Sequence, residues 1–263
     1  MSLSTSLSER HALVCGASSG LGREVALAMA AAGASLSLLA RNAEKLQELA
    51  KLCRQKGATA VTAYSVDLED RLALSAAADD ITAAQGAVHI LVNNSGGPPG
   101  GPLLEASEQD FLKPLTRHLF ASHFLVQRLV GGMKAAGYGR ILNVISTSVK
   151  EPIAGLGVSN TVRGAMASWA KTLSKELPPG ITINNLLPGF TATDRLESLK
   201  STVAGRQGIS ESDVEANWMA TVPEGRLGDP RELAALAAFL ASPAGAFIRG
   251  QSIAVDGGRL NSI

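Results

Sequence analysis

Apolar and polar positions follow two alternating patterns along the chain. Short, almost continuous apolar runs predict buried strands, because a strand covered by helices on both faces has no polar side. Between most of them lie stretches with apolar residues at helical spacing, including 21–33, 42–57 and 71–85. The strand-like runs occupy residues 11–16, 35–40, 58–66, 88–94, 140–146, 181–188 and 251–258.

This alternation predicts an α/β fold. Strands that alternate with helices pair as a parallel sheet, and the connecting helices cover both of its faces. We therefore expect one doubly wound domain of the Rossmann type, with a seven-stranded, mainly parallel sheet. The stretch 42–57 illustrates the helices: Leu46, Leu49 and Cys53 share one face, Asn42 is a possible N-cap, and Gly57 ends it.

The domain organisation is simple. No linker rich in Pro and Ser divides the chain, and no internal repeat is visible, so residues 1–263 are predicted to form a single domain. Residues 1–8 are predicted to be a disordered arm. The polar stretch 190–223 is predicted to be a lid over a substrate, with Phe190, Leu196, Leu199 and Trp218 able to close over it.

Composition narrows the class of protein. The 24 Lys and Arg residues nearly balance 23 Asp and Glu residues, for a net charge of +1, so nothing favours nucleic acid or a membrane as a partner. No apolar run approaches the ~20 residues that cross a bilayer. Cys15 and Cys53 provide neither a disulfide framework nor the spacing of a metal site. We predict a soluble, cytoplasmic protein without a metal.

A glycine-rich turn, GASSGLG, joins the first predicted strand to the first predicted helix, with glycines at 16, 20 and 22. The N-terminus of a helix presents free N–H groups to an anion, and glycines allow the backbone to approach a pyrophosphate. The second strand ends in LLARN, with Arg41 and without a carboxylate. An arginine there accommodates a 2′-phosphate, which favours NADP(H) over NAD(H).

The motifs GASSGLG, VDL (66–68), VNNSGG (92–97), RILNVIS, LPGFTAT (187–193) and GQSIAVDGG occur in this order. Together they resemble the short-chain dehydrogenase/reductase family, most closely its 3-oxoacyl-acyl-carrier-protein-reductase-like members, over about residues 9–258. The resemblance implies that a dinucleotide contacts Gly16, Ser18, Ser19, Gly20, Leu21, Gly22, Arg41, Asp67, Leu68, Asn93, Ser95, Gly96, Arg163, Pro188, Gly189 and Thr193.

The catalytic positions depart from the family. Its members resemble one another in an Asn, Ser, Tyr and Lys constellation, in which tyrosine donates a proton to the substrate oxygen. Here the serine is Ser146, the tyrosine position holds Ser159, and the lysine position holds Arg163. His118 falls at the asparagine position. An aliphatic hydroxyl is a far weaker acid than a phenol, and a guanidinium does not release its proton.

Three replacements for the missing acid remain open. His118 titrates near neutral pH in its ordinary state. Lys150 follows Ser146 by four residues and is the second possible donor. Otherwise Ser146, Ser148, Ser159 and Arg163 polarise a reactive carbonyl while water supplies the proton. The two tyrosines, Tyr64 and Tyr138, are expected to lie away from the pocket.

Two functions follow from these observations. The first is an NADP(H)-dependent oxidoreductase for a carbonyl or alcohol, with altered acid chemistry. The second is a dinucleotide-binding protein without turnover, acting as a sensor or partner subunit. Arg163 would bind either an anionic group of the substrate or the nicotinamide ribose. The resemblance also implies a possible acyl-carrier-linked substrate, and a homodimer or homotetramer formed through helices at about 106–134 and 159–177.

Overall fold

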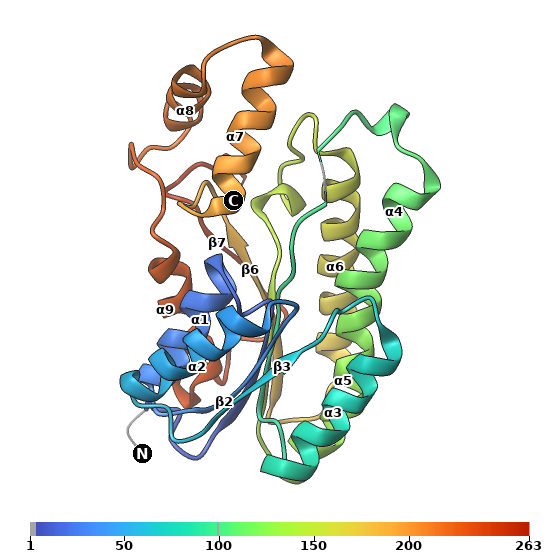
Figure 1. Ribbon diagram of the computed structural model, residues 1–263, viewed down its shortest axis with the longest axis vertical. Coiled ribbons are helices and arrows are strands. Elements are labelled where there is room, and N and C mark those ends of the chain that lie inside the picture. Colours follow the sequence, from blue (N-terminus) through green and yellow to red (C-terminus); the bar gives the residue numbers. More distant parts are fainter. Residues whose placement is uncertain (1–3, 99, 263) are drawn as a thin grey trace.

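The computed structural model describes residues 4–98 and 100–262, and its centre is a seven-stranded parallel sheet (Figure 1). The strand order is β3-β2-β1-β4-β5-β6-β7, with every neighbouring pair parallel. The predicted α/β fold is therefore confirmed. The strands are β1 (His11–Cys15), β2 (Ser35–Ala40), β3 (Val61–Ser65), β4 (Ile90–Asn93), β5 (Gly139–Val144), β6 (Ile181–Pro188) and β7 (Ser252–Val255).

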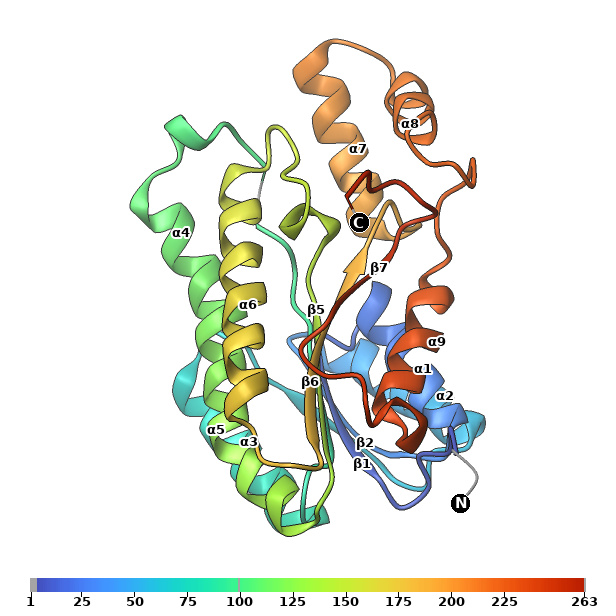
Figure 2. The same ribbon diagram turned by 180° about the vertical axis from the view of Figure 1, so that it is seen from behind.

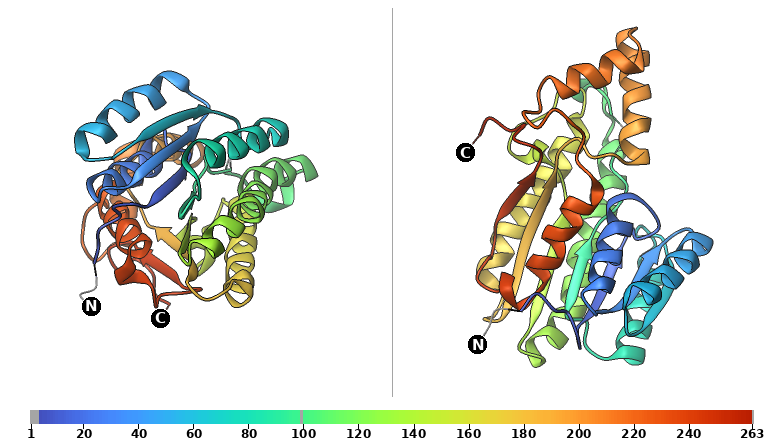
Figure 3. Two further views of the ribbon diagram at one scale, coloured as in Figure 1. Left: turned by 90° about the horizontal axis from the view of Figure 1, so that it is seen from below. Right: turned by 90° about the vertical axis from the view of Figure 1, so that its left-hand side faces the viewer.

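Helices cover both faces of the sheet, as Figures 2 and 3 show. One face carries α1 (Gly20–Ala31), α2 (Ala43–Lys56) and α9 (Pro230–Ala241). The other carries α3 (Arg71–Gln85), α5 (Ala121–Ala135) and α6 (Gly157–Glu176), with α4 (Glu108–Leu115) leading into α5. The helices α7 (Asp194–Gln207) and α8 (Glu211–Met219) project beyond the sheet. No helix within the described residues is long and apolar enough to cross a membrane.

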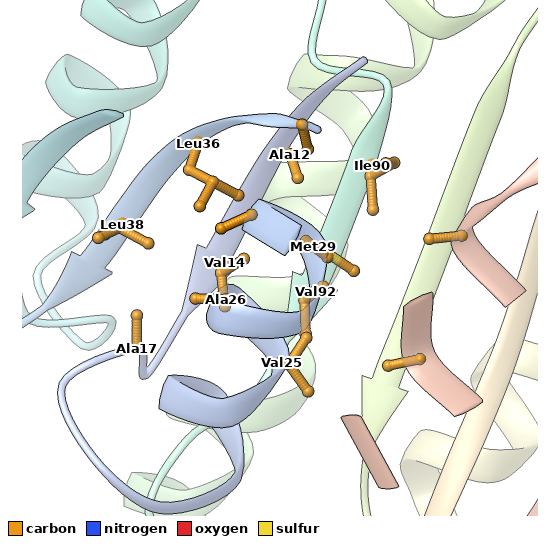
Figure 4. Close-up of a cluster of buried hydrophobic side chains, with 14 of the residues drawn as sticks. Ala12, Val14, Ala17, Val25, Ala26, Met29, Leu36, Leu38, Ile90 and Val92 are labelled. Carbon is orange, nitrogen blue, oxygen red and sulfur yellow. The ribbon is translucent and has the colours of Figure 1, made fainter. Parts of the chain in front are cut away.

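The strand β1 shows why its apolar run is continuous. Successive side chains of a strand point to opposite faces. Ala12 and Val14 pack under α1, in the cluster shown in Figure 4, while Leu13 and Cys15 join the cluster on the other face. All five residues of β1 are buried. A run that is almost wholly apolar is thus the expected pattern of a strand between two helical layers.

The N-terminal segment differs from the prediction. Residues 1–3 of the predicted arm lie outside the described residues, but Ser4–Ser8 pack against the domain. Leu7 is fully buried in the cluster beneath α1, and its N–H donates to the Ala32 carbonyl at 2.8 Å. The Ser4 carbonyl accepts from Ala244 N–H at 3.1 Å. The prediction of a disordered arm is wrong for these residues, because burying Leu7 holds the segment in place.

The predicted helix at 106–134 is not continuous. It begins with α4, passes through one π-helical turn, Thr116–Phe120, and continues as α5. Pro114 lies inside α4 just before that turn, and proline has no N–H to donate within a helix. Such π turns often occur at functional sites. This one positions Arg117 and His118, which are considered below.

A ladder of polar side chains crosses four strands at one level of the sheet. Asn93 on β4 donates through Nδ2 to Oδ1 of Asn143 on β5, at 2.8 Å. Asn143 donates in the same way to Asn185 on β6 at 2.9 Å, and Asn185 donates to Ser252 Oγ on β7 at 3.0 Å. We call this the amide ladder. Its members are direct partners in the strand register, so the ladder and the backbone pairing support each other.

Candidate active site

A cavity of about 800 Å³ opens at the carboxyl ends of the strands. The strand order reverses between β1 and β4, and in doubly wound sheets ligands bind beside this switch point. The volume lies within the usual range for a small-molecule or cofactor site. Residues of α7 form one wall, so the predicted lid lies over the carboxyl edge of the sheet (Figure 1).

The glycine-rich turn lines one end of the cavity. Ser19 is the N-cap residue of α1, yet its side chain makes no capping hydrogen bond, and the first turn carries no acidic residue. The N-terminal end of α1 is therefore available to an anion. Gly16 and Gly20 both have positive φ angles, 59° and 53°, which favour glycine. This geometry fits the pyrophosphate of a dinucleotide.

Gly22 has a different role from the one predicted, since it does not line the cavity. A Cβ there would lie 2.6 Å from Asn94 Nδ2 and against the Gly16 carbonyl oxygen. The absence of a side chain thus allows α1 to approach the turn and β4 closely. Asn94 adds to this packing by donating to the Gly16 carbonyl at 3.2 Å.

Arg41 stands at the end of β2 with most of its side chain exposed. Its nearest acidic partner is Asp67, with 3.9 Å between Nη1 and Oδ2, a separation that leaves the guanidinium free to bind another anion. Both residues line the cavity, together with Asn42 and Leu68. The arrangement fits an adenosine ribose carrying a 2′-phosphate.

Most of the predicted cofactor residues lie together along this cavity. They are Gly16, Ser18, Ser19, Gly20, Leu21, Arg41, Asp67, Leu68, Ser95, Gly96, Arg163, Pro188, Gly189 and Thr193. Asn93 does not line it, because its side chain is buried in the amide ladder. Asn93 therefore supports the strand beneath the site rather than a ribose.

The catalytic candidates Ser146, Ser159 and Arg163 line the other end of the same cavity. Ser146 Oγ accepts from Ser148 N–H at 3.1 Å, at the turn that follows β5. Ser159 lies in the first turn of α6, and its Oγ accepts from Arg163 Nε at 3.2 Å. Arg163 also donates to the Ile145 carbonyl. The three side chains thus surround one polar corner.

Arg163 remains a cation in this corner. Burial, and then the nearby charge of Arg195, lower the pKa of its guanidinium to about 10. That pKa is still well above neutral pH, so Arg163 provides a fixed positive charge there and does not act as an acid. This agrees with the ordinary chemistry of arginine.

His118 lies behind the cavity rather than in its lining. Its ring contacts Ser95 Oγ at 3.0 Å through Nδ1 and the Gly96 carbonyl at 3.2 Å through Nε2. Burial, and then the charge of Arg163, lower the pKa of His118 to about 3. The imidazole is neutral at pH 7, which disagrees with the hypothesis that His118 replaces the tyrosine as the acid. It supports Ser95 instead.

The other possible donors do not line the cavity either. Lys150 is exposed and does not line the cavity. Tyr138 is buried with its hydroxyl on the Ala241 carbonyl, and Tyr64 on β3 packs beside α3, so both lie away from the pocket as predicted. Asn160 bonds the Ile153 carbonyl at 2.8 Å and holds the loop before α6. Among the described residues, no cluster of three His, Cys, Asp or Glu side chains could hold a metal ion.

Three cavity arginines were not predicted from the sequence: Arg117, Arg195 and Arg259. Arg117 follows the proline of α4 and pairs with Glu69. Arg195 occupies the first turn of α7, and its Nη2 donates to the Pro98 carbonyl at 2.7 Å. Arg259 follows β7 and lies over the Phe190 ring, with 4.8 Å from Cζ to the ring centroid. The only sequence signal was proximity to other features: Arg117 follows Pro114, Arg195 follows the LPGFTAT motif, and Arg259 follows the GQSIAVDGG motif.

The segment predicted to be a lid, residues 190–223, contributes apolar contacts to the cavity. Phe190, Leu196 and Leu199 line it. Trp218 on α8 stacks on Phe190, with ring centroids 4.8 Å apart and 12° between the planes. Arg195 and Arg206 of α7 donate to the carbonyls of Pro98 and Gly100. The lid thus contacts the loop that follows β4.

Comparison with known proteins now places the chain. A family model described as enoyl-(acyl carrier protein) reductase matches residues 16–259. The chain is 31% identical over 259 residues to the NADPH-dependent reductase BacG of Bacillus subtilis (strain 168), which covers 98% of this chain and 100% of that protein. It therefore belongs to the short-chain dehydrogenase/reductase family, as its motifs predicted.

Two further relatives agree with this assignment. The 3-oxoacyl-acyl-carrier-protein reductase FabG of Vibrio cholerae is 30% identical over 253 residues, covering 96% of this chain and 98% of that one. The structure of L-sorbose reductase from Gluconobacter frateurii, complexed with NADPH and L-sorbose, superposes with a TM-score of 0.90 at 27% identity. That match covers 98% of this chain and 99% of the other.

Proposed function

We propose that this protein is an NADP(H)-dependent reductase that delivers hydride to the carbonyl carbon of a small molecule without a tyrosine acid. The observation that carries the proposal is one continuous cavity. It joins a phosphate-binding turn and Arg41 at one end to Ser146, Ser159 and Arg163 at the other. The names of BacG and of the L-sorbose reductase complex, both associated with NADPH, support the choice of cofactor.

The cofactor end fits NADP(H) through three groups of this chain. The uncapped start of α1 offers backbone N–H groups to the pyrophosphate. Arg41 offers an exposed guanidinium to the 2′-phosphate, and Asp67 and Leu68 lie beside it for the adenine. When bound, the reduced nicotinamide supplies the hydride.

At the reaction end, Ser146 and Ser159 hold the carbonyl oxygen. Each hydroxyl accepts a hydrogen bond from a neighbouring N–H and can donate its own hydrogen to the substrate. A hydroxyl whose oxygen already accepts is a stronger donor, because hydrogen bonds in a chain polarise one another. Arg163 and the N-terminal end of α6 stabilise the negative charge that develops on that oxygen.

The proton comes from water in this proposal. Neither Arg163, with a pKa of about 10, nor His118, with a pKa of about 3, is a suitable acid at neutral pH. A positioned acid typically accelerates such steps by about 10²–10⁴-fold. The enzyme should therefore reduce unactivated ketones slowly and favour carbonyls that accept hydride readily.

A second candidate is a dinucleotide-binding protein without turnover, and the loss of tyrosine and lysine is the observation that favours it. Calorimetric titration with NADPH and NADH, followed by a carbonyl screen that monitors NADPH oxidation, separates the two. Binding of NADPH with oxidation above the buffer rate supports the reductase. Binding without oxidation by any carbonyl supports the second candidate, and no binding of either nucleotide would overturn both.

We also propose a homodimer or homotetramer in which α5 and α6 take part. Phe120, at the start of α5, is 47% exposed, and the Trp169 ring on α6 lies edge-on to His123, with centroids 6.2 Å apart. Phe120 is exposed, whereas Trp169 is half-buried, and an exposed aromatic side chain favours contact with another chain. Light scattering after size exclusion tests this: a monomer at micromolar concentration would contradict it, and Phe120→Glu should dissociate an assembly.

A further inference from the structure

Some of the arginines that line the cavity have a carboxylate nearby, and others do not. Arg41 and Arg117 each lie near a carboxylate, Asp67 and Glu69 respectively. The ion pairs found among residues 4–98 and 100–262 include none of the other three cavity arginines, Arg163, Arg195 and Arg259. These three bond only to neutral groups of the described structure.

Two of these guanidiniums converge at Gly97. A Cβ on Gly97 would lie 3.2 Å from Arg163 Nη2 and 3.6 Å from both Nε and Nη2 of Arg195. Each cation is held there by a backbone carbonyl, Ile145 for Arg163 and Pro98 for Arg195. Like charges brought together in a partly buried site repel, and a bound anion would offset that repulsion.

The third guanidinium approaches the same corner from the C-terminal segment. Arg259 Nη1 lies 3.4 Å from Thr147 Oγ1, while its Nε is buried without a partner among the described residues. Arg163 contacts Ile145, and Arg259 contacts Thr147. These two contact residues precede and follow Ser146 in the sequence, so both guanidinium groups are held next to Ser146. The corner that holds the carbonyl oxygen is therefore next to unpaired positive charge.

The proposed cofactor does not need these three arginines for its phosphates. The N-terminal end of α1 would bind its pyrophosphate, and Arg41 would bind its 2′-phosphate. The lining also has an apolar part, formed by Ile153, Leu156 and Leu199. A ligand that satisfies both features has an apolar body and an anionic group near its carbonyl.

We propose that the substrate carries a carboxylate or phosphate group close to its carbonyl, and that Arg195 and Arg259 bind it. Arginine forks pair bidentately with either group. This inference rests on the proposed reductase function and names its substrate class. Asp194, beside Arg195 in the lining, faces the same cavity and limits how many negative charges the site tolerates.

The test is calorimetric titration of the NADP⁺-saturated protein with hexanoate, hexyl phosphate and hexanamide, which share an apolar chain and differ in their head groups. We expect at least one of the two anions to bind 10-fold or more tightly than hexanamide. Arg195→Gln and Arg259→Gln should each weaken the binding of that anion by about 10- to 100-fold, because each removes a charge-assisted hydrogen bond. The affinity for hexanamide should change less than twofold.

Arg206→Gln is the matched control. Arg206 lies on the same helix as Arg195 and makes the same kind of bond to a carbonyl, at Gly100, but it does not line the cavity. It should leave all three affinities unchanged. NADPH affinity within twofold of the parent shows that each variant is folded and that Arg195 does not serve the cofactor.

Three results would overturn the inference while leaving the reductase intact. They are no binding of either anion, equal affinities for the anions and hexanamide, and an Arg195→Gln variant that loses NADPH as strongly as it loses the anion. Absence of NADPH binding in the parent protein is a separate outcome, and it would overturn the proposed function itself.

Discussion

The two ends of the cavity are built from different parts of the chain. At the phosphate end, the groups that face a ligand are backbone N–H groups at the start of α1, positioned by glycines. At the reaction end they are the side chains Ser146, Ser159 and Arg163. A site made of backbone depends on the path of the chain, whereas a site made of side chains changes with single substitutions. The glycine-rich pattern that the resemblance implies lies at the first end, and the proposed departure from the family's catalytic residues lies at the second.

The largest expected effect is at the backbone-built end. Gly22→Ala places a Cβ against the Gly16 carbonyl oxygen and 2.6 Å from Asn94 Nδ2, so α1 must shift. We expect loss of measurable NADPH binding and a fall of about 1–3 kcal/mol in the free energy of unfolding. Calorimetry and urea unfolding measure the two quantities.

Gly205→Ala is the control for that variant, because Gly205 is exposed on α7 and a Cβ there meets no atom within 4 Å. It should bind NADPH normally and unfold at equal or higher urea. Retention of NADPH binding by Gly22→Ala would show that the turn is not the pyrophosphate site.

The second prediction restores the family's side chains at the reaction end. Ser159→Tyr/Arg163→Lys supplies a phenol acid and an ammonium, so reduction of an unactivated ketone should rise toward the ~10²–10⁴-fold range that general acids contribute. The rate of NADPH oxidation with cyclohexanone measures it. Single substitutions serve as controls. An unchanged rate would mean that the pair alone does not account for the altered chemistry.

The third prediction concerns the choice between cofactors. Arg41→Ala removes the exposed guanidinium at the end of β2, so NADPH affinity should fall by about 10- to 100-fold, the effect of a charge-assisted hydrogen bond. NADH affinity should stay within twofold. Equal losses for both nucleotides would contradict a 2′-phosphate contact and point to a general role of Arg41 in the site.

The last prediction concerns the pH dependence of stability and comes from His118. Its pKa is about 3 in the folded protein and near 6.5 when exposed, so below pH 6.5 the unfolded chain takes up a proton that the folded chain does not. The contribution of His118 to the free energy of unfolding is fully present above pH 6.5. It declines as the pH falls toward 3, by up to about 1.4 kcal/mol per pH unit. Urea unfolding at pH 7 and pH 5 tests this.

His118→Asn provides the comparison, since an amide does not titrate in this range and asparagine is the residue that the family resemblance implies. Its stability should fall less than that of the parent between the two pH values. His11, with a pKa lowered to about 4 by burial, contributes a similar acid sensitivity in both proteins and cancels from the difference. An equal loss in both proteins would place the sensitivity elsewhere.

The fold was predictable because its signals are local. Each of the seven apolar runs became a strand, and Asn42 caps α2 through a bond from Lys45 N–H at 2.9 Å, as its position predicted. The glycine-rich turn between the first strand and the first helix likewise followed from spacing, whereas the order of the strands within the sheet came only from the structure. Leu7 was missed because one apolar residue in a polar segment carries no periodicity.

The reaction end was only partly predictable, because it is assembled from distant segments. The guanidinium groups of Arg195 and Arg163 both lie beside Gly97. Arg259 contacts Thr147, which is 112 positions away along the chain. Nothing in the spacing of these residues indicates that they share a corner. His118 was assigned to the right helix, but its burial behind Ser95, and hence its neutral state, depends on packing that a sequence pattern does not reveal.

The amide ladder has one further consequence. From Asn93 to Ser252 every side chain donates in the same direction, so turning one amide over would oblige its neighbours to turn as well. The four strands beneath the reaction end should therefore open together rather than one by one. In hydrogen–deuterium exchange, the backbone amides of β4 to β7 at the level of the ladder would lose protection at a common rate. Strands β4 to β7 would then form one cooperative unit beneath the substrate.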